Sequence, residues 1–264
     1  MLELFILASG SKGNAAIVRN IEAERSVLVD CGITKRDFFE RCEVLGADPT
    51  EIEAVLVTHT HTDHTSGLGV VLRGLARQHS EPALYTHPLV HQASTRVQEV
   101  EDLVEINELA YNQALNLAGM TILPFPTSHD VDASCGFRFE AEDDALGYMT
   151  DTGYVTPEAH SALKGVRILA IESNHDVGML REGPYPYVLQ QRILGDEGHL
   201  SNDQCCEEVE LLLHPNLEQI VAMHISEHNN TFGIPVRELQ RVLDAHSHSA
   251  IVQAGLPRTP IHVV

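Results

Sequence analysis

The feature that most constrains this chain is a histidine-rich run directly after an apolar stretch. Residues 54–57 (AVLV) are typical of a buried strand, and residues 58–64 (THTHTDH) place three imidazoles and a carboxylate immediately after it. Side chains alternate along an extended chain, so His59 and His61 point the same way, and a following turn can bring Asp63 and His64 to a second position. Neutral imidazole and carboxylate suit zinc or a similar divalent ion. The run predicts a metal-binding loop, and two ions are the natural interpretation.

A histidine-rich surface loop or a single structural ion would explain the same run. Structural zinc sites are usually closed by four ligands and rely on Cys, whereas residues 58–64 contain no Cys and include a carboxylate. This composition favours a catalytic centre over a structural one.

Three more His or Asp residues stand at or just beyond the ends of apolar runs. Residues 120–125 lead to His129, residues 145–150 lead to Asp151, and residues 219–223 lead to His224. Taken singly, such a residue is more often a turn former or a hydrogen-bonded group than a ligand. Together with the run at 58–64, the three favour a shared metal centre.

The order of these elements resembles the metallo-β-lactamase superfamily of two-metal hydrolases over nearly the whole chain. The resemblance implies an α/β fold, the four-layer αβ/βα sandwich. It also implies that one ion is held by His59, His61 and His129, that the other is held by Asp63, His64 and His224, and that Asp151 bridges them. The H-x-H-x-D-H element occurs in thioesterases, lactonases, β-lactamases and phosphodiesterases of the superfamily, so it indicates the fold better than the substrate.

Other stretches resemble one branch, the bacterial exonucleases of the YycJ (WalJ) type, which are similar to ribonuclease Z and to phosphoribosyl cyclic phosphodiesterases. The stretches are residues 7–14 (LASGSKGN), 172–176 (ESNHD), 179–186 (MLREGPYP), 198–202 (GHLSN) and 224–231 (HISEHNNT). The branch implies a metal-dependent hydrolase that cuts nucleic-acid phosphodiester bonds as a 5′ to 3′ exonuclease.

The resemblance to ribonuclease Z implies catalytic roles for His199 and Glu172, and the chemistry of hydrolysis suggests a third role, for Asp63. His199, held by Glu172, would protonate the leaving alkoxide, because a carboxylate beside an imidazole favours its charged form. Asp63 would accept the proton of the attacking water. A simpler interpretation of His199 is that it only precedes a helix capped near residues 201–203. For His175 the alternatives of lining the pocket, supporting a ligand and facing solvent stay open, and no role is assigned to His228.

The loop at residues 9–14 (SGSKGN) joins two strand-like runs, residues 2–8 and 15–19. Its glycines and successive N–H groups could cradle a phosphate, although an ordinary hairpin turn explains them equally well. The loop lacks the Lys-Ser/Thr ending of a nucleotide P-loop. The candidate substrate-binding residues are Ser9, Ser11, Asn14 and Asn202.

Composition sets the remaining expectations. The chain has 264 residues, 43% of them hydrophobic, enough for a substantial core, and we expect one domain over residues 1–264. Helices are expected at residues 67–78, 88–98, 157–163, 202–214 and 236–246. The opening apolar run predicts a strand rather than an export signal, and no run is long enough to span a membrane. Five Cys without a C-x-x-C pair fit a cytoplasmic protein with reduced thiols.

The formal net charge of −21, from 17 Lys+Arg against 38 Asp+Glu, disfavours broad binding of duplex DNA, which depends on a basic face. Lys12, Arg181 and Arg192 could help the metals attract a phosphate, or they could be ordinary surface charges. The leading hypothesis is a two-metal phosphodiesterase, with zinc or manganese, acting on nucleic-acid ends. The alternatives are a phosphodiesterase for a small cyclic phosphate, a thioesterase or lactonase, and a binding module without catalysis.

Overall fold

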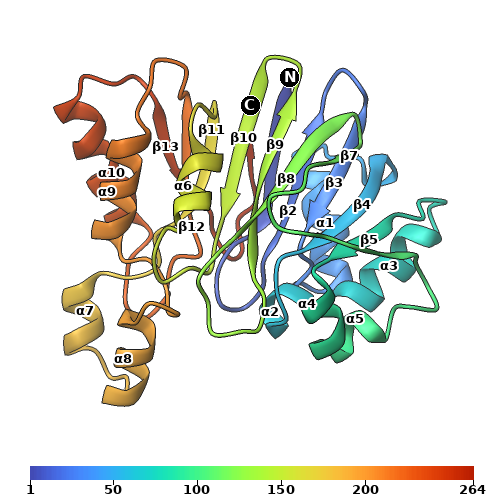
Figure 1. Cartoon of the computed structure of the whole chain (residues 1–264), viewed down its shortest axis with the longest axis horizontal. Coiled ribbons are helices and arrows are strands. Elements are labelled where there is room, and N and C mark those ends of the chain that lie inside the picture. The colour runs from blue at the N-terminus through green and yellow to red at the C-terminus, as the bar shows by residue number, and fades with distance from the viewer.

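Two seven-stranded mixed sheets lie face to face in the computed structural model, which describes residues 1–264 (Figure 1). The first sheet has the order β14 (Ile261–Val263), β1 (Leu2–Ala8), β2 (Ala15–Asn20), β3 (Arg25–Val29), β4 (Ile52–Val57), β5 (Ala83–Thr86) and β6 (Ile106–Glu108). The second has the order β13 (Ile251–Ala254), β12 (Gln219–Met223), β11 (Ile168–Glu172), β10 (Asp144–Met149), β9 (Cys135–Ala141), β8 (Met120–Pro126) and β7 (Leu115–Leu117).

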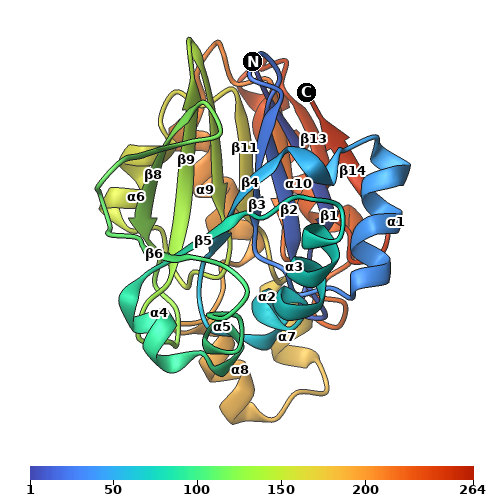
Figure 2. The ribbon, with the colours of Figure 1, turned by 90° about the vertical axis from the view of Figure 1, so that its right-hand side faces the viewer.

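Helices cover the outer face of each sheet. The helices beside the first sheet are α1 (Lys35–Leu45), α2 (Thr62–Thr65), α3 (Leu68–Ala76), α4 (Pro88–Ala93) and α5 (Thr95–Gln98), with a 3₁₀ turn at Pro49–Glu51. The helices beside the second sheet are α6 (Pro157–Leu163), α9 (Asn202–Leu212) and α10 (Gly233–Ala245). Two more, α7 (Val177–Glu182) and α8 (Tyr187–Leu194), extend beyond the ends of the strands, away from both chain termini (Figures 1 and 2).

Three apolar clusters hold these layers together. One lies between the sheets and includes Leu4 and Val29 from the first and Phe137 and Tyr148 from the second. The other two join each sheet to its own helices, through residues such as Leu72 of α3 on one side and Leu239 of α10 on the other. Burial of apolar surface on both faces of each sheet stabilises the four-layer αβ/βα order that the resemblance implies.

The strand directions place many chain segments at one end of the sandwich. Strands β3, β4 and β5 are parallel to one another, as are β10, β11 and β12, and β8 runs in the direction of β10 because each is antiparallel to β9. The carboxyl ends of parallel strands share one edge of a sheet, which is where α/β proteins bind ligands. The loops after β3, β4, β8, β10, β11 and β12 therefore meet in one place.

The expected helices agree with the structure in part. The helix expected at 157–163 has those bounds, whereas the one expected at 88–98 is two helices, because Ser94 leaves the helical region (φ −94°, ψ 107°) and its hydroxyl caps α5. Helices α1, α7 and α8 and the four-residue α2 were not expected. Their apolar stripes are weak: α1 buries only Phe38 and Cys42, and α8 buries no residue. None of the helices combines the length and apolar character needed to cross a bilayer.

Candidate metal centre

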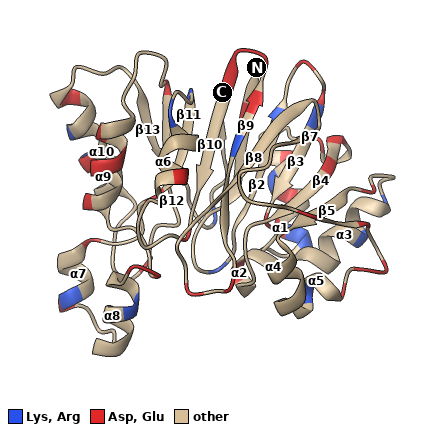
Figure 3. Cartoon of the chain, viewed as in Figure 1, with Lys and Arg blue, Asp and Glu red and all other residues tan.

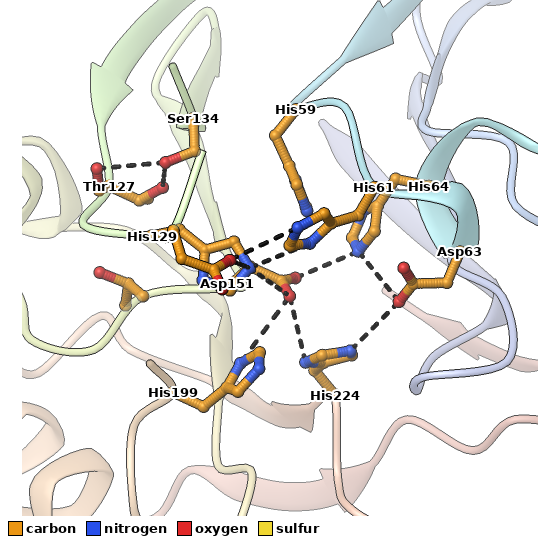
Figure 4. Close-up of polar contacts among 12 residues, drawn as sticks. His59, His61, Asp63, His64, Thr127, His129, Ser134, Asp151, His199 and His224 are labelled. Carbon is orange, nitrogen blue, oxygen red and sulfur yellow. Dashed lines mark hydrogen bonds and ion pairs between the residues drawn. The ribbon is translucent and has the colours of Figure 1, made fainter. Parts of the chain in front are cut away.

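The strand-end loops bring seven candidate ligands into one cluster (Figure 4). Ligand atoms within 4.8 Å of one another define one group of His59, His61 and His129, another of Asp63, His64 and His224, and a third of His59, His64 and Asp151. The first two groups are the two ligand sets that the sequence resemblance implies. Asp151 lies between them, with Oδ2 3.2 Å from His64 Nε2 and Oδ1 3.7 Å from His129 Nε2.

Backbone conformation helps to aim these side chains. Asp30, Asp151 and His224 all have positive φ, at 56°, 55° and 51°. Each follows a strand, and the left-handed residue turns the chain sharply at the sheet edge. Such conformations are uncommon for residues other than glycine and persist where the surrounding structure requires them, often at functional sites.

Three of the imidazoles, those of His59, His64 and His129, are oriented by a bond from Nδ1 to a group outside the ligand set. His64 Nδ1 donates to Asp30 Oδ2 at 2.7 Å, and His129 Nδ1 donates to the carbonyl of Gly198 at 3.1 Å. The Thr58 hydroxyl donates to Asp30 Oδ2 and accepts from His59 Nδ1 at 2.9 Å. Metal-ligating histidines in proteins are held in this manner, with the ring fixed and the second nitrogen free for the ion.

Glu172, at the end of β11, connects the cluster to His199. Its Oε1 accepts from both His224 Nδ1 and His199 Nδ1 at 2.8 Å, and its Oε2 accepts from the backbone N–H of Thr152 at 2.9 Å. Burial opposes ionisation, but the His199 and His224 imidazoles outweigh it and lower the pKa of Glu172 to about 2. One ionised carboxylate thus orients both imidazoles and leaves His199 Nε2 free to face the cavity.

Several polar atoms of the cluster have no partner within the protein. His59 Nε2, His224 Nε2 and Asp151 Oδ2 are buried without a hydrogen bond. Buried polar atoms are nearly always hydrogen-bonded, so these three are open to a partner from outside the polypeptide. Divalent metal ions fit this role, because each of the three atoms is of a type that ligates zinc or manganese.

The charges of the cluster also fit bound cations. Burial opposes its charged forms, yet neighbouring groups hold the pKa of Asp151 well below its usual value, and Asp151 and Glu172 raise the pKa of His224 to about 10. The pKa of His64 is likewise held well above its usual value, because Asp151 and Asp30 outweigh burial. The ionised carboxylates buried in the cluster are therefore stabilised by positive charge beside them.

A cavity of about 240 Å³ opens onto the cluster. His61, Asp63, His129, Asp151, His199 and His224 all line it, together with residues from the segment that contains α8. Of the four candidate substrate-binding residues, Ser11 alone reaches this cavity.

The other three candidates do not line the cavity but are buried in hydrogen-bond networks beside it, so a role in substrate binding stays a prediction for them. Ser9 Oγ accepts from the backbone N–H of His224 at 2.7 Å, and Asn14 Nδ2 lies 2.9 Å from His64 Nε2. Asn202 Oδ1 accepts from Ser173 and Asn230. These residues hold the loops that carry the site.

The structure also places the His and basic residues whose roles the sequence left open. His175 is buried beneath the site, with burial lowering its pKa to about 4 and neither ring nitrogen partnered, and His228 is exposed. Lys12 pairs with Glu227, whereas Arg192 lines the cavity and pairs with Asp130.

Sequence reasoning missed Asp30, which supports His64 and Thr58. The signal was present, because Asp30 follows the apolar strand β3 as Asp151 follows β10. Asp130, which directly follows His129, was likewise given no role from the sequence.

Close backbone packing under the metal loop gives a testable prediction. A Cβ atom at Gly32 would lie 1.5 Å from the carbonyl oxygen of Asp63, so Gly32→Ala must displace the loop that carries Asp63 and His64. We expect destabilisation of about 3 kcal/mol, at the upper end for overpacking, and loss of bound metal. Thermal unfolding and elemental analysis measure the two effects.

Gly69→Ala is the matched control, because its Cβ would meet the flexible end of Arg73 at 3.2 Å and make an ordinary contact with Val100 at 3.6 Å. If both variants keep the stability and metal content of the parent, the packing role of Gly32 is wrong.

Comparisons with known proteins agree with this geometry. The family model described as "Beta-lactamase superfamily domain" matches residues 25–225. The exodeoxyribonuclease WalJ of Streptococcus pneumoniae is 33% identical over 227 residues, which are 85% of this chain and 82% of WalJ. The exodeoxyribonuclease YycJ of Bacillus anthracis is 30% identical over 248 residues, 92% of this chain and 89% of YycJ.

A solved structure supports the fold. The metallo-β-lactamase fold protein YhfI of Bacillus subtilis superposes with a TM-score of 0.72 over 99% of both chains, at 14% identity. The fold and the cluster thus define the class, a metallo-β-lactamase fold with His and Asp groups that can hold divalent metal. The chain belongs to the beta-lactamase superfamily and, within it, to the family of the WalJ and YycJ proteins.

Proposed function

We propose that this protein is a dinuclear metal-dependent phosphodiesterase that removes nucleotides from nucleic-acid ends, as a 5′ to 3′ exonuclease built in one domain over residues 1–264. Zinc or manganese would be held by His59, His61 and His129 at one position and by Asp63, His64 and His224 at the other, with Asp151 between. The family membership supports the reaction class, because relatives at 30–33% identity are named exodeoxyribonucleases.

The metals, when bound, would polarise the scissile phosphate and neutralise the charge that develops during in-line displacement. The chain's own residues must move the protons. The Asp63 carboxylate lines the cavity, with Oδ2 3.6 Å from both His64 Nε2 and His224 Nε2, and it would take the proton of the attacking water. His199 Nε2 would give a proton to the leaving oxygen.

The observation that carries this proposal is the Glu172–His199 pair beside the metal cluster. Its bond of 2.8 Å fixes the ring so that Nδ1 stays protonated toward Glu172 and Nε2 faces the cavity. An alkoxide leaving group is a strong base and requires such a donor. A thioesterase has a thiolate leaving group, which departs without one, so the pair favours a phosphodiester substrate.

A phosphodiesterase for a small cyclic phosphate is the second candidate. The cavity of about 240 Å³ is small. The net charge of −21 disfavours an extended basic face of the kind that binds a long nucleic-acid strand. In the cartoon of Figure 3, the Lys and Arg positions of α7 and α8 are short segments among uncharged residues.

Activity assays separate these candidates. The protein loaded with zinc or with manganese is incubated with end-labelled DNA, a ribose cyclic phosphate, bis(p-nitrophenyl) phosphate and an acyl thioester, each with and without EDTA. We expect EDTA-sensitive release of mononucleotides from DNA ends. Hydrolysis of the cyclic phosphate alone would select the second candidate, and thioester turnover without diester turnover would refute both.

A further inference from the structure

One wall of the metal-centre cavity has no role in the chemistry described above. It is formed by Tyr185, just before α8, and by Leu189, Arg192 and Ile193 of α8. Tyr185, Leu189 and Ile193 are the three hydrophobic residues among the 17 that line the cavity, so all of its hydrophobic side chains come from this one segment.

This segment does not serve the core. Helix α8 has no buried residue, and it extends with α7 beyond the ends of the strands (Figures 1 and 2). Leu189 and Ile193 are four residues apart and Arg192 is three after Leu189, so they share one helical face, which faces the cavity. Tyr187 and Val188 are 72% and 79% exposed and do not line it. The helix therefore presents a mixed apolar and basic face to whatever occupies the cavity.

Arg192 is held in place beside the metal cluster. Its guanidinium pairs with the Asp130 carboxylate, whose Oδ1 lies 3.4 Å from His61 Nε2 and 3.5 Å from His129 Nε2. Asp130 Oδ1 has no hydrogen-bond partner within the protein. Arg192 is the only basic residue (Lys or Arg) that lines the cavity. Its guanidinium therefore lies between α8 and the candidate ligands.

The lining of the cavity thus combines two kinds of chemistry. Besides the polar cluster it includes a tyrosine ring and two aliphatic side chains, and the Tyr185 ring is 5.9 Å from the exposed His228 ring. A nucleotide has this same division, with an anionic phosphate and a planar base that packs against aromatic and aliphatic surfaces. The cavity, at about 240 Å³, is smaller than the roughly 300–1,000 Å³ of typical ligand pockets, which limits it to about one such unit.

We propose that Tyr185, Leu189, Arg192 and Ile193 form a nucleoside-binding subsite, which holds the base and sugar of one nucleotide while Arg192 contacts its phosphate. This subsite deepens the proposed function, on which it rests for the choice of substrate. It would explain cleavage at strand ends, because the cavity holds one nucleotide and the rest of the strand must leave through the opening of the cavity.

Binding of two small phosphates tests the subsite without relying on turnover. Calorimetric titration of the metal-loaded protein with thymidine 5′-monophosphate and with methyl phosphate separates the contribution of the nucleoside from that of the phosphate. We expect the thymidine compound to bind more tightly. Tyr185→Ala should weaken thymidine monophosphate roughly tenfold relative to methyl phosphate, as for loss of an aromatic stacking partner, and Leu189→Ser should act in the same direction.

Tyr187→Ala is the matched control, since it removes the same side chain from the same segment at a position that does not line the cavity. Thermal unfolding of all variants shows whether the fold is kept. Equal affinity of the parent for the two phosphates, or equal effects of Tyr185→Ala and Tyr187→Ala, would overturn the subsite. A preference for thymidine monophosphate in a protein that hydrolyses no diester would support the subsite and refute the proposed function.

Discussion

Replacement of His199 by alanine should reduce hydrolysis of end-labelled DNA by about 10² to 10⁴-fold, the usual contribution of general acid catalysis. His199 Nδ1 is bonded to Glu172 at 2.8 Å, which leaves Nε2 as the proton donor at the cavity. Because His199 is outside the seven proposed ligands, metal content should stay at the parent level. Rates under single-turnover conditions and elemental analysis measure the two quantities.

The choice of leaving group distinguishes proton donation from a merely structural role. p-Nitrophenolate is stable as an anion and needs little protonation, so His199→Ala should impair p-nitrophenyl diesters far less than DNA. His160→Ala is the control, because His160 also donates from Nδ1 to a glutamate, Glu208, at 2.8 Å but does not line the cavity. Equal losses on both substrates would argue against the acid role.

Replacement of Asp151 by asparagine is expected to abolish activity together with metal binding. Asp151 lies between the two proposed ligand groups and is buried, and its Oδ2 has no hydrogen-bond partner in the protein. Loss of its charge leaves the ions without the carboxylate that both would share. Asparagine is preferred to alanine here, because it keeps the shape and tolerates the positive φ of 55°. Metal content after dialysis and DNA hydrolysis are the measurements.

Asp143→Asn makes the same chemical change at an exposed position in the turn between β9 and β10, and it should leave metal content and activity at parent levels. Full metal content in Asp151→Asn would show that this carboxylate is not a shared ligand.

The convergence of the seven ligand candidates was predictable in part because each stands at or just beyond the end of an apolar strand. The carboxyl ends of parallel strands meet at one edge of a sheet, but His129, Asp151 and His224 follow strands of the second sheet. The resemblance to the superfamily was therefore needed to place them beside residues 59–64. The ligand roles themselves stay predictions, as do the catalytic roles of Asp63, Glu172 and His199.

Burial and side-chain direction were less predictable. Ser9 and Asn14 are small polar residues in a loop and Asn202 begins α9, positions that suggest contact with substrate, yet all three bond to the backbone and side chains that support the site. Helix α8 was missed for a related reason. Its apolar residues face a cavity and not the core, so they form too narrow a stripe for the helical periodicity to show.

The central claim is that a dinuclear centre forms among these side chains. A crystal structure of the protein loaded with manganese or zinc, with anomalous scattering recorded at the metal edge, tests it directly. We expect two anomalous peaks about 3.5 to 4 Å apart, one among His59, His61 and His129 and the other among Asp63, His64 and His224. A single peak, or peaks away from these residues, would contradict the proposal.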